Sequence, residues 1–311
     1  MMTKAAVIGL GTMGPGITAT LARGGIEVSA FDVNSEVLEA GQKNIDIAFK
    51  VLDALGTPDR SIAPVRLTPN LEDCVAGADL VIENAPEDID VKLAIFKELE
   101  KLVTAKCVLA SDSSGIPISK LQDGSNHPDR FIGMHWSNPP HIIPMIEVIA
   151  GKETDMNIVD WLMKLIRDLG LIPVFVKKDV PGFVENRVLY ALLRECIDLV
   201  EQGVIEPIDL DTCVSWGIGY KLSVIGPMAL LDTAGLDIYQ AVGTYLNKEL
   251  CQRNDVSSLI KDKTKAGKLG MKSESGVFSY TKDQVATLRT DRARALVAVR
   301  KALDSSTDRK A

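Results

Sequence analysis

Short apolar runs alternate with longer amphipathic segments through the first half of the chain. The runs near the start and middle are almost continuously apolar, which is typical of strands in a sheet covered on both faces. Helical periodicity occupies residues 14–24, 35–55, 90–103 and 157–169 between them. This alternation predicts an α/β fold with an open, mostly parallel sheet. Strands are expected at residues 5–9, 27–31, 65–67, 80–83, 107–110, 131–134, 145–149 and 172–176.

The pattern changes after residue 178, where apolar positions recur only at helical spacing. A helix is expected to begin at Pro181 and to continue to about Gln202, with Gly203 ending it. We therefore predict a sheet domain over residues 1–178 and an all-α domain over residues 179–311. Further helices are expected at residues 207–216, 227–250, 256–266 and 282–303.

A glycine-rich turn follows the first predicted strand and opens the first predicted helix. Its sequence, Gly9-Leu-Gly11-Thr-Met13-Gly14, is G-x-G-x-x-G in the context that dinucleotide binding requires. Gly9 allows the tight turn, Gly11 lets the backbone approach a pyrophosphate, and Gly14 lets the helix pack against the strand. The residues of this turn, Met13 included, are predicted to border a dinucleotide.

Asp32 closes the second predicted strand and follows the glycine turn at the spacing of a ribose-binding acid. A carboxylate there accepts hydrogen bonds from the ribose hydroxyls and repels a 2′-phosphate. Val33 and Asn34 come next, so no arginine follows Asp32 to bind such a phosphate. The sequence therefore predicts NAD rather than NADP. The alternative is an ordinary glycine turn beside a solvated aspartate.

Charge and composition narrow the class of protein. The chain has 35 Lys plus Arg and 42 Asp plus Glu, a net charge of −7, and nucleic-acid binders carry the opposite balance. No apolar run approaches the roughly 18 residues of a membrane span. The five cysteines form no CxxC pair, which favours reduced thiols in a cytoplasmic protein without a metal site.

Two polar residues lie within or at the end of apolar runs predicted to be strands. His135 ends one run and precedes a Pro-Pro loop, which places it to face a ligand. Glu147 lies inside the next run, where a buried carboxylate needs a partner. A carboxylate on one imidazole nitrogen stabilises the imidazolium and leaves the other nitrogen as a general base. We predict that His135 and Glu147 form this catalytic pair. The alternative is a satisfied core histidine beside an edge-strand glutamate.

Together these motifs resemble the 3-hydroxyacyl-CoA dehydrogenase family over about residues 4–280. The resemblance implies a Rossmann-like NAD-binding domain, a helical C-terminal domain that dimerises, and a small-molecule substrate. It rests on the glycine turn and Asp32, on Ala110-Ser-Asp-Ser-Ser114, on His135-Trp-Ser-Asn138-Pro, on Glu147, and on Asp179-Val-Pro-Gly-Phe-Val-Glu-Asn186-Arg.

The resemblance also implies roles for single residues. His135 would take the hydroxyl proton of the substrate, with Glu147 orienting it. Ser114 would hydrogen-bond the substrate oxygen, and Asn186 matches the substrate-site asparagine of the family. Glu87, Lys92 and Asn138 match family positions near the nicotinamide and its ribose, and Lys272 matches a C-terminal lysine close to the cofactor.

Three departures argue against an acyl-CoA substrate. The segment after Asp32, which should grip the CoA phosphates, carries only Lys43, Lys50 and Arg60 as cations. The histidine motif reads His-Trp-Ser-Asn-Pro-Pro-His, where acyl-CoA enzymes of the family typically show two Phe and Pro-Val-Pro. About 30 residues with one helical pattern follow residue 280, the usual end of the family. Family members with such features, such as carnitine and gulonate dehydrogenases, oxidise small non-CoA hydroxy or aldehyde compounds. We expect a substrate of this class here, and a true 3-hydroxyacyl-CoA dehydrogenase is the alternative.

Two other protein classes share parts of this pattern. The β-hydroxyacid dehydrogenases open with the same glycine turn, but they use a lysine in a second-domain helix, and residues 181–199 contain none. A lens structural protein also resembles this family, but the full set of candidate catalytic residues argues against a lost active site. Apolar faces in residues 184–199 and 227–250, together with the resemblance, predict a homodimer.

Overall fold

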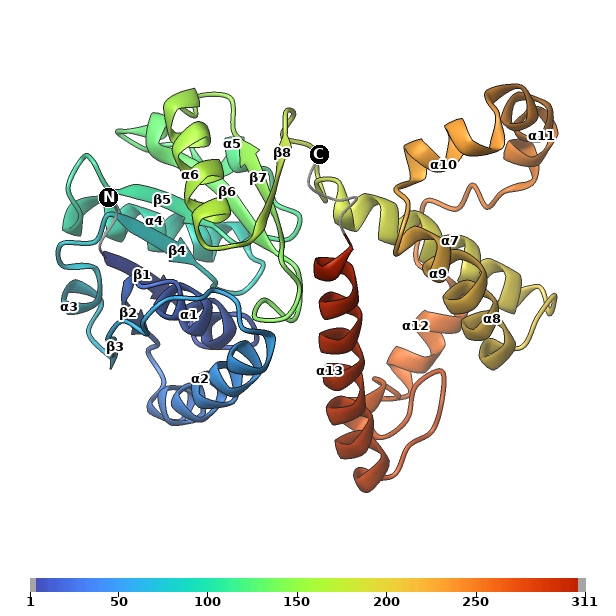
Figure 1. Ribbon diagram of the computed structural model, residues 1–311, viewed down its shortest axis with the longest axis horizontal. Coiled ribbons are helices and arrows are strands. Elements are labelled where there is room, and N and C mark those ends of the chain that lie inside the picture. The colour runs from blue at the N-terminus through green and yellow to red at the C-terminus, as the bar shows by residue number, and fades with distance from the viewer. Residues whose placement is uncertain (1–3, 307–311) are drawn as a thin grey trace. The chain divides into compact units, whose positions relative to one another are not determined.

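The computed structural model (Figure 1) describes residues 4–306 and forms two compact units, Met1–Asn186 and Arg187–Ala311. The first unit is built on one sheet in the order β3-β2-β1-β4-β5-β6-β7-β8, and only the β6–β7 pair is antiparallel. The predicted mostly parallel α/β sheet is confirmed. The strands are β1 (Lys4–Ile8), β2 (Glu27–Phe31), β3 (Val65–Thr68), β4 (Leu80–Glu83), β5 (Val108–Ser111), β6 (Phe131–Trp136), β7 (Met145–Ala150) and β8 (Ile172–Val176).

Helices cover both faces of this sheet, so its central strands, such as β4, β5 and β6, are buried on two sides. Successive residues of β1 point to opposite cores: Ala5 and Val7 join one apolar cluster, and Ala6 joins the other. This double burial is why the strands read as continuous apolar runs. The first cluster packs under α1 (Gly14–Arg23), α2 (Ser35–Leu55) and α6 (Met156–Asp168), and the second under α3 (Leu71–Val75), α4 (Ile89–Leu102) and α5 (Ile118–Leu121), with the short helix η1 (Pro128–Arg130) before β6.

Residues 179–186 fold with the first unit, although the sequence analysis placed them in the second domain. The Asp179 carboxylate accepts the backbone N–H groups of Ile118 (3.0 Å) and Ser119 (2.6 Å). The predicted helix start at Pro181 is wrong. Gly182 and Phe183 both have positive φ, +76° and +46°, and two left-handed residues in succession cannot belong to an α-helix. The helix therefore begins at Glu185.

The second unit consists of helices apart from two isolated bridges in its described part. The predicted helix over residues 227–250 is broken at Gly235, whose φ of +99° is open to glycine and costly for other residues. No single helix among the described residues is long and apolar enough to span a membrane; one bent pair, Pro207–Leu222 with Pro227–Ala234, passes that test jointly. The helices are α7 (Glu185–Glu201), α8 (Pro207–Cys213), the π-turn η2 (Val214–Gly219), α9 (Tyr220–Leu222), α10 (Pro227–Ala234), α11 (Leu236–Glu249), α12 (Ser258–Lys265), η3 (Met271–Ser273) and α13 (Lys282–Ser305).

Candidate active site

The antiparallel pairing of β6 and β7 sets His135 directly opposite Glu147. The imidazole Nδ1 lies 2.8 Å from Oε2 of Glu147, and both side chains are almost fully buried. The other carboxylate oxygen, Oε1, accepts the backbone N–H groups of Val184 (2.9 Å) and Glu185 (3.1 Å). Glu147 is thus held at both oxygens, and Nε2 is the imidazole nitrogen left for substrate.

Phe183 arranges the backbone that grips Glu147. It is fully buried, and its ring centroid lies 5.8 Å from that of His135. Its φ of +46° lies in the left-handed region, which non-glycine residues seldom occupy. This conformation turns the chain between Pro181 and the start of α7, and the two N–H groups that follow both reach Glu147. Such backbone strain persists where surrounding contacts hold it, often at functional sites. The sequence analysis singled out this motif but not the role of Phe183.

The charges around His135 favour its protonated form. Burial alone would lower the pKa of the imidazole, but the Glu147 hydrogen bond and the nearby Asp112 and Glu185 carboxylates outweigh it and raise that pKa above 6.5. Burial would raise the pKa of Glu147, yet its hydrogen bonds to His135 and to the backbone lower it. The pair is therefore an imidazole of enhanced basicity beside an ionised carboxylate.

Ser114 and Asn186, the two predicted substrate-site residues, lie together. The Asn186 side-chain amide donates a 2.7 Å hydrogen bond to the Ser114 carbonyl oxygen, and the Ser114 side chain is exposed. Asn138 is also exposed, in the loop after β6. Beside it the Ser137 hydroxyl donates to Glu185. The hydroxyl of Ser114 is thus free to face a ligand, and its substrate role stays a prediction.

One carboxylate and imidazole cluster has the spacing of a metal site. The donor atoms of His135, Glu147 and Glu185 lie within 4.8 Å of one another. The hydrogen bonds just described already engage these three side chains: Nδ1 with Oε2, Oε1 with two backbone N–H groups, and Glu185 with the Ser137 hydroxyl. The arrangement is that of a hydrogen-bonded proton-transfer site, with Nε2 of His135 left open.

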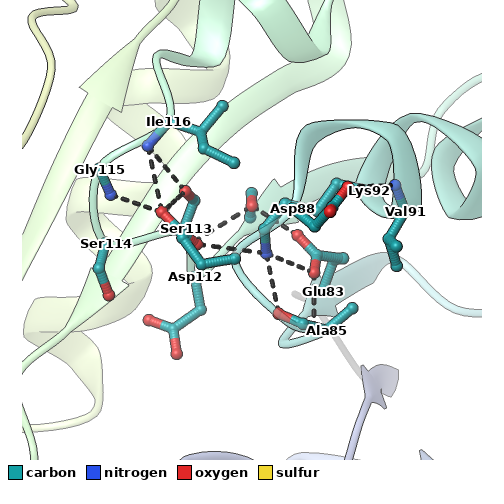
Figure 2. Close-up of polar contacts among 12 residues, drawn as sticks. Glu83, Ala85, Asp88, Val91, Lys92, Asp112, Ser113, Ser114, Gly115 and Ile116 are labelled. Atoms are coloured by element: carbon teal, nitrogen blue, oxygen red, sulfur yellow. Dashed lines mark hydrogen bonds and ion pairs between the residues drawn. The ribbon is translucent and has the colours of Figure 1, made fainter. Parts of the chain in front are cut away.

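A buried ion pair lies at the end of β4, next to the loop that carries Ser114 (Figure 2). Lys92 and Glu83 are 1% and 0% exposed, with Nζ 2.7 Å from Oε1. Nζ also donates to the Ala85 carbonyl (3.1 Å), and the Ser111 hydroxyl donates to the second oxygen of Glu83 (2.6 Å). The sequence analysis did not foresee this pair. The one sequence signal for this pair was that Lys92 follows Glu83 by nine residues, across the turn from a strand to a helix.

Glu87 organises the turn that carries Ser114. Its carboxylate accepts the Ser113 hydroxyl (2.6 Å) and the backbone N–H groups of Gly115 (2.8 Å) and Ile116 (3.2 Å). The Lys92 ammonium lies 3.8 Å from it. Figure 2 shows the Ser113–Ile116 turn whose hydroxyl and backbone N–H groups make these contacts. Glu87 and Lys92 thus have protein partners, and their predicted contacts with the cofactor stay predictions.

The glycine turn has the shape of a dinucleotide cradle. A Cβ on Gly14 would lie 2.0 Å from the carbonyl oxygen of Gly9, and a Cβ on Gly9, whose φ is +102°, would lie 2.8 Å from that of Asn84. Neither position accepts a side chain. A Cβ on Gly11 would meet nothing within 4 Å, so the open space lies where a pyrophosphate would approach the start of α1. Met13, half-buried, directly precedes α1.

Asp32 links this turn to the end of β2. Its carboxylate accepts the backbone N–H groups of Leu10 and Asn34, each at 3.0 Å. The carboxylate is fixed beside the cradle, with lone pairs left for ribose hydroxyls. These residues fit NAD, which when bound supplies the hydride acceptor. Lys272 is an exposed residue of η3 in the second unit, and its part in binding NAD stays a prediction.

Replacing Asp32 by alanine is expected to relax the preference for NAD. The wild-type protein should bind NAD at least about tenfold more tightly than NADP, because the carboxylate repels a 2′-phosphate. The variant should narrow that ratio. Titrating both cofactors by fluorescence measures it, and equal affinities in the wild-type protein would contradict the role assigned to Asp32.

Comparison with known proteins identifies the same family as the sequence motifs. Two profiles of the 3-hydroxyacyl-CoA dehydrogenases match: the NAD binding domain over residues 4–180 and the C-terminal domain over residues 182–280. The chain is 57% identical to 5-formyl-3-hydroxy-2-methylpyridine 4-carboxylate 5-dehydrogenase of Mesorhizobium japonicum, over 98% of this chain and 99% of that one. It is 34% identical to the probable 3-hydroxybutyryl-CoA dehydrogenase of Deinococcus radiodurans, over 89% of this chain and 100% of that one.

A solved structure shows the same similarity. The crystal structure of a 5-formyl-3-hydroxy-2-methylpyridine 4-carboxylic acid 5-dehydrogenase, described as an NAD⁺ dependent dismutase, aligns with a TM-score of 0.96 and 57% identity. The alignment covers 98% of this chain and 99% of that one. The similarity therefore extends beyond residue 280, where the C-terminal family profile ends.

Proposed function

Since the chain belongs to the 3-hydroxyacyl-CoA dehydrogenase family and is an NAD-dependent oxidoreductase, we propose that its substrate is 5-formyl-3-hydroxy-2-methylpyridine 4-carboxylate, oxidised at the aldehyde to the dicarboxylate. The observation that carries this proposal is the 57% identity over 98% of the chain to a dehydrogenase of that name. The proposal places the enzyme in bacterial breakdown of vitamin B6.

The His135–Glu147 pair supports oxidation of a hydrated aldehyde. The free Nε2 of His135 accepts a proton from a hydroxyl of the hydrate, and Glu147 stabilises the imidazolium that forms. Ser114, whose turn Glu87 holds in place, donates a hydrogen bond to the substrate oxygen. When bound, NAD accepts the hydride. The relative of known structure is called a dismutase, and the same residues would serve the reverse direction, with His135 returning a proton as a second aldehyde is reduced.

The small number of cations in the segment after Asp32 favours a small substrate over an acyl-CoA. Arg60, one of three cations in the segment after Asp32, donates to the backbone carbonyl oxygens of Asp168 (3.0 Å) and Gly24 (3.4 Å). Lys43 and Lys50 are the other two, both exposed on α2. Two flexible lysines offer little for a ligand with three phosphates. A carboxylated pyridine needs no such arm.

The test of this function is a comparison of substrates on the purified protein. We expect NADH formation with the pyridine aldehyde, and weaker activity with carnitine, gulonate and acetoacetyl-CoA, the last measured as NADH consumption. Product analysis by mass spectrometry should show the dicarboxylate, with the corresponding alcohol beside it if dismutation occurs. Preference for acetoacetyl-CoA would contradict the proposal and favour a true 3-hydroxyacyl-CoA dehydrogenase.

We also propose that the protein is a homodimer joined through its second unit. Helices α10 and α11 contain no buried residue, and Met228, Ile238 and Tyr245 are each more than half exposed. Apolar surface of this kind is uncommon on monomers, and a two-fold axis would bury the same patch twice. Light scattering at micromolar concentration should give twice the chain mass of 33.6 kDa, about 67 kDa. A monomer would refute this assembly.

The cysteines resolved in the structure are free thiols, in line with the expected cytoplasmic location.

A further inference from the structure

A buried carboxyl group, Asp112, lies beside the His135 pair and has no part in the mechanism so far. Strand β5 ends at Ser111, while its neighbour β6 continues to Trp136. Asp112 follows at once: its backbone N–H donates to the Glu83 carbonyl (2.9 Å), and its Oδ1 accepts the N–H of Trp136 (2.7 Å). The hydrogen bond to the residue next to His135 anchors the carboxyl group at the reaction site.

The second oxygen of Asp112 is available to a ligand. The side chain is 8% exposed, and Oδ2 accepts no hydrogen bond from any residue in the range 4–306. Figure 2 shows the carboxyl group directed away from the contacts of Glu83 and the Ser113–Ile116 turn. Asp112 therefore does not belong to the network that holds Ser114, although it is part of the same loop.

The charged groups facing Asp112 come from three elements: His135 on β6, Glu83 on β4 and Lys92 on α4. Burial raises the pKa of Asp112 to about 8, and the Trp136 hydrogen bond and the positive charges oppose that rise only partly. A carboxyl group that titrates near neutrality can both accept and release a proton during turnover.

Oxidation of an aldehyde calls for such a group, because it releases two protons and oxidation of an alcohol releases one. The aldehyde and water give the hydrate, RCHO + H₂O → RCH(OH)₂. Loss of hydride then gives the acid, RCH(OH)₂ + NAD⁺ → RCOOH + NADH + H⁺, and the acid ionises to RCOO⁻ + H⁺. His135 accounts for one of the two protons, and a second acceptor is needed at the site.

We propose that Asp112 is that second acceptor and activates the water that hydrates the aldehyde, an inference that rests on the proposed function. The carboxylate takes one proton from the water as its oxygen bonds to the aldehyde carbon and the C=O π pair moves to the carbonyl oxygen. The resulting RCH(OH)O⁻ loses its hydride to NAD⁺ as the C=O bond re-forms. His135 takes the remaining hydroxyl proton, and the carboxylate product leaves with both protons accounted for.

Asp112→Asn tests this role, because the amide keeps an oxygen for the Trp136 N–H and cannot accept a proton. We expect kcat for aldehyde oxidation to fall by about 10²-fold, while reduction of the same aldehyde by NADH, which needs a single proton from His135, stays within about threefold. Wild-type oxidation should rise with pH through about 8, since the base acts when deprotonated, and the variant should lose that rise. Asp155→Asn, which changes a carboxylate that caps the backbone of α6, is the matched control and should leave both rates unchanged.

The outcomes separate this inference from the function on which it rests. Oxidation that survives in Asp112→Asn, or that falls equally with reduction, would overturn the role of Asp112 and leave the substrate assignment standing. A wild-type protein that oxidises no aldehyde would overturn both. As a second measurement, removing the Asp112 charge should lower the pKa of His135 seen by NMR, because that charge favours the imidazolium; an unchanged pKa would show that the two groups are not coupled.

Discussion

Replacing His135 by glutamine is expected to lower turnover by about 10² to 10⁴ in both oxidation and reduction, the range of a general base. Glutamine keeps a polar side chain opposite Glu147 but cannot take the substrate proton. NAD affinity should change little, because the glycine turn and Asp32 do not contact this pair in any hydrogen bond of the described chain. Steady-state kinetics with a separate cofactor titration measures both quantities. Near-full activity of the variant would contradict the mechanism.

Glu147→Gln is the companion variant, and its effect depends on pH. Glu147 is one of the groups that raise the pKa of His135, so its loss should lower that pKa. The base acts when neutral, so the rising limb of kcat/KM against pH should move to lower pH, while kcat falls through loss of charge stabilisation of the imidazolium. A limb that stays in place would show that Glu147 has only a structural part.

Replacing Lys92 by methionine is expected to destabilise the first unit by about 3 to 5 kcal/mol, because it leaves the Glu83 charge buried without a partner. That is a large share of the roughly 5 to 15 kcal/mol by which most domains are stable. The Ser114 turn should also loosen, since Glu87 loses its nearby cation. Urea unfolding followed by tryptophan fluorescence measures the change.

Two variants control this result. Glu83→Gln combined with Lys92→Met removes both charges and should recover most of the lost stability. Lys101→Met removes a cation from an exposed ion pair with Glu98, 61% and 49% exposed, and should cost less than about 1 kcal/mol. A Lys92→Met variant as stable as the Lys101→Met variant would mean that Glu83 is not charged in the folded protein.

Local patterns determined much of the first unit from sequence. Strands buried on both faces must be apolar throughout, and this made the central strands readable; all eight strands were predicted close to their observed bounds. The glycine turn was readable for the same kind of reason: at Gly9 and Gly14 a side chain would collide with neighbouring backbone, so the residue type itself records the contact. The partner of His135 was also accessible, because an acid within an apolar strand has few ways to be satisfied.

The features that the sequence analysis did not predict depend on residues that come into contact only in the folded chain. Gly235 alone does not say that α10 ends there, since glycine is tolerated within helices at a modest cost; the φ of +99° decides it. Pro181 favours a helix start by itself, and the left-handed Phe183 beside Glu147 overrides that preference. The Lys92–Glu83 pair and the site of Asp112 arise where β4, β5 and β6 lie side by side, 28 residues of chain separating Glu83 from Ser111. The sequence alone therefore determines which side chains this protein has for binding NAD and moving a proton. Only the tertiary structure decides which of them are buried together. That arrangement matters because burial makes the interaction between neighbouring charges strong.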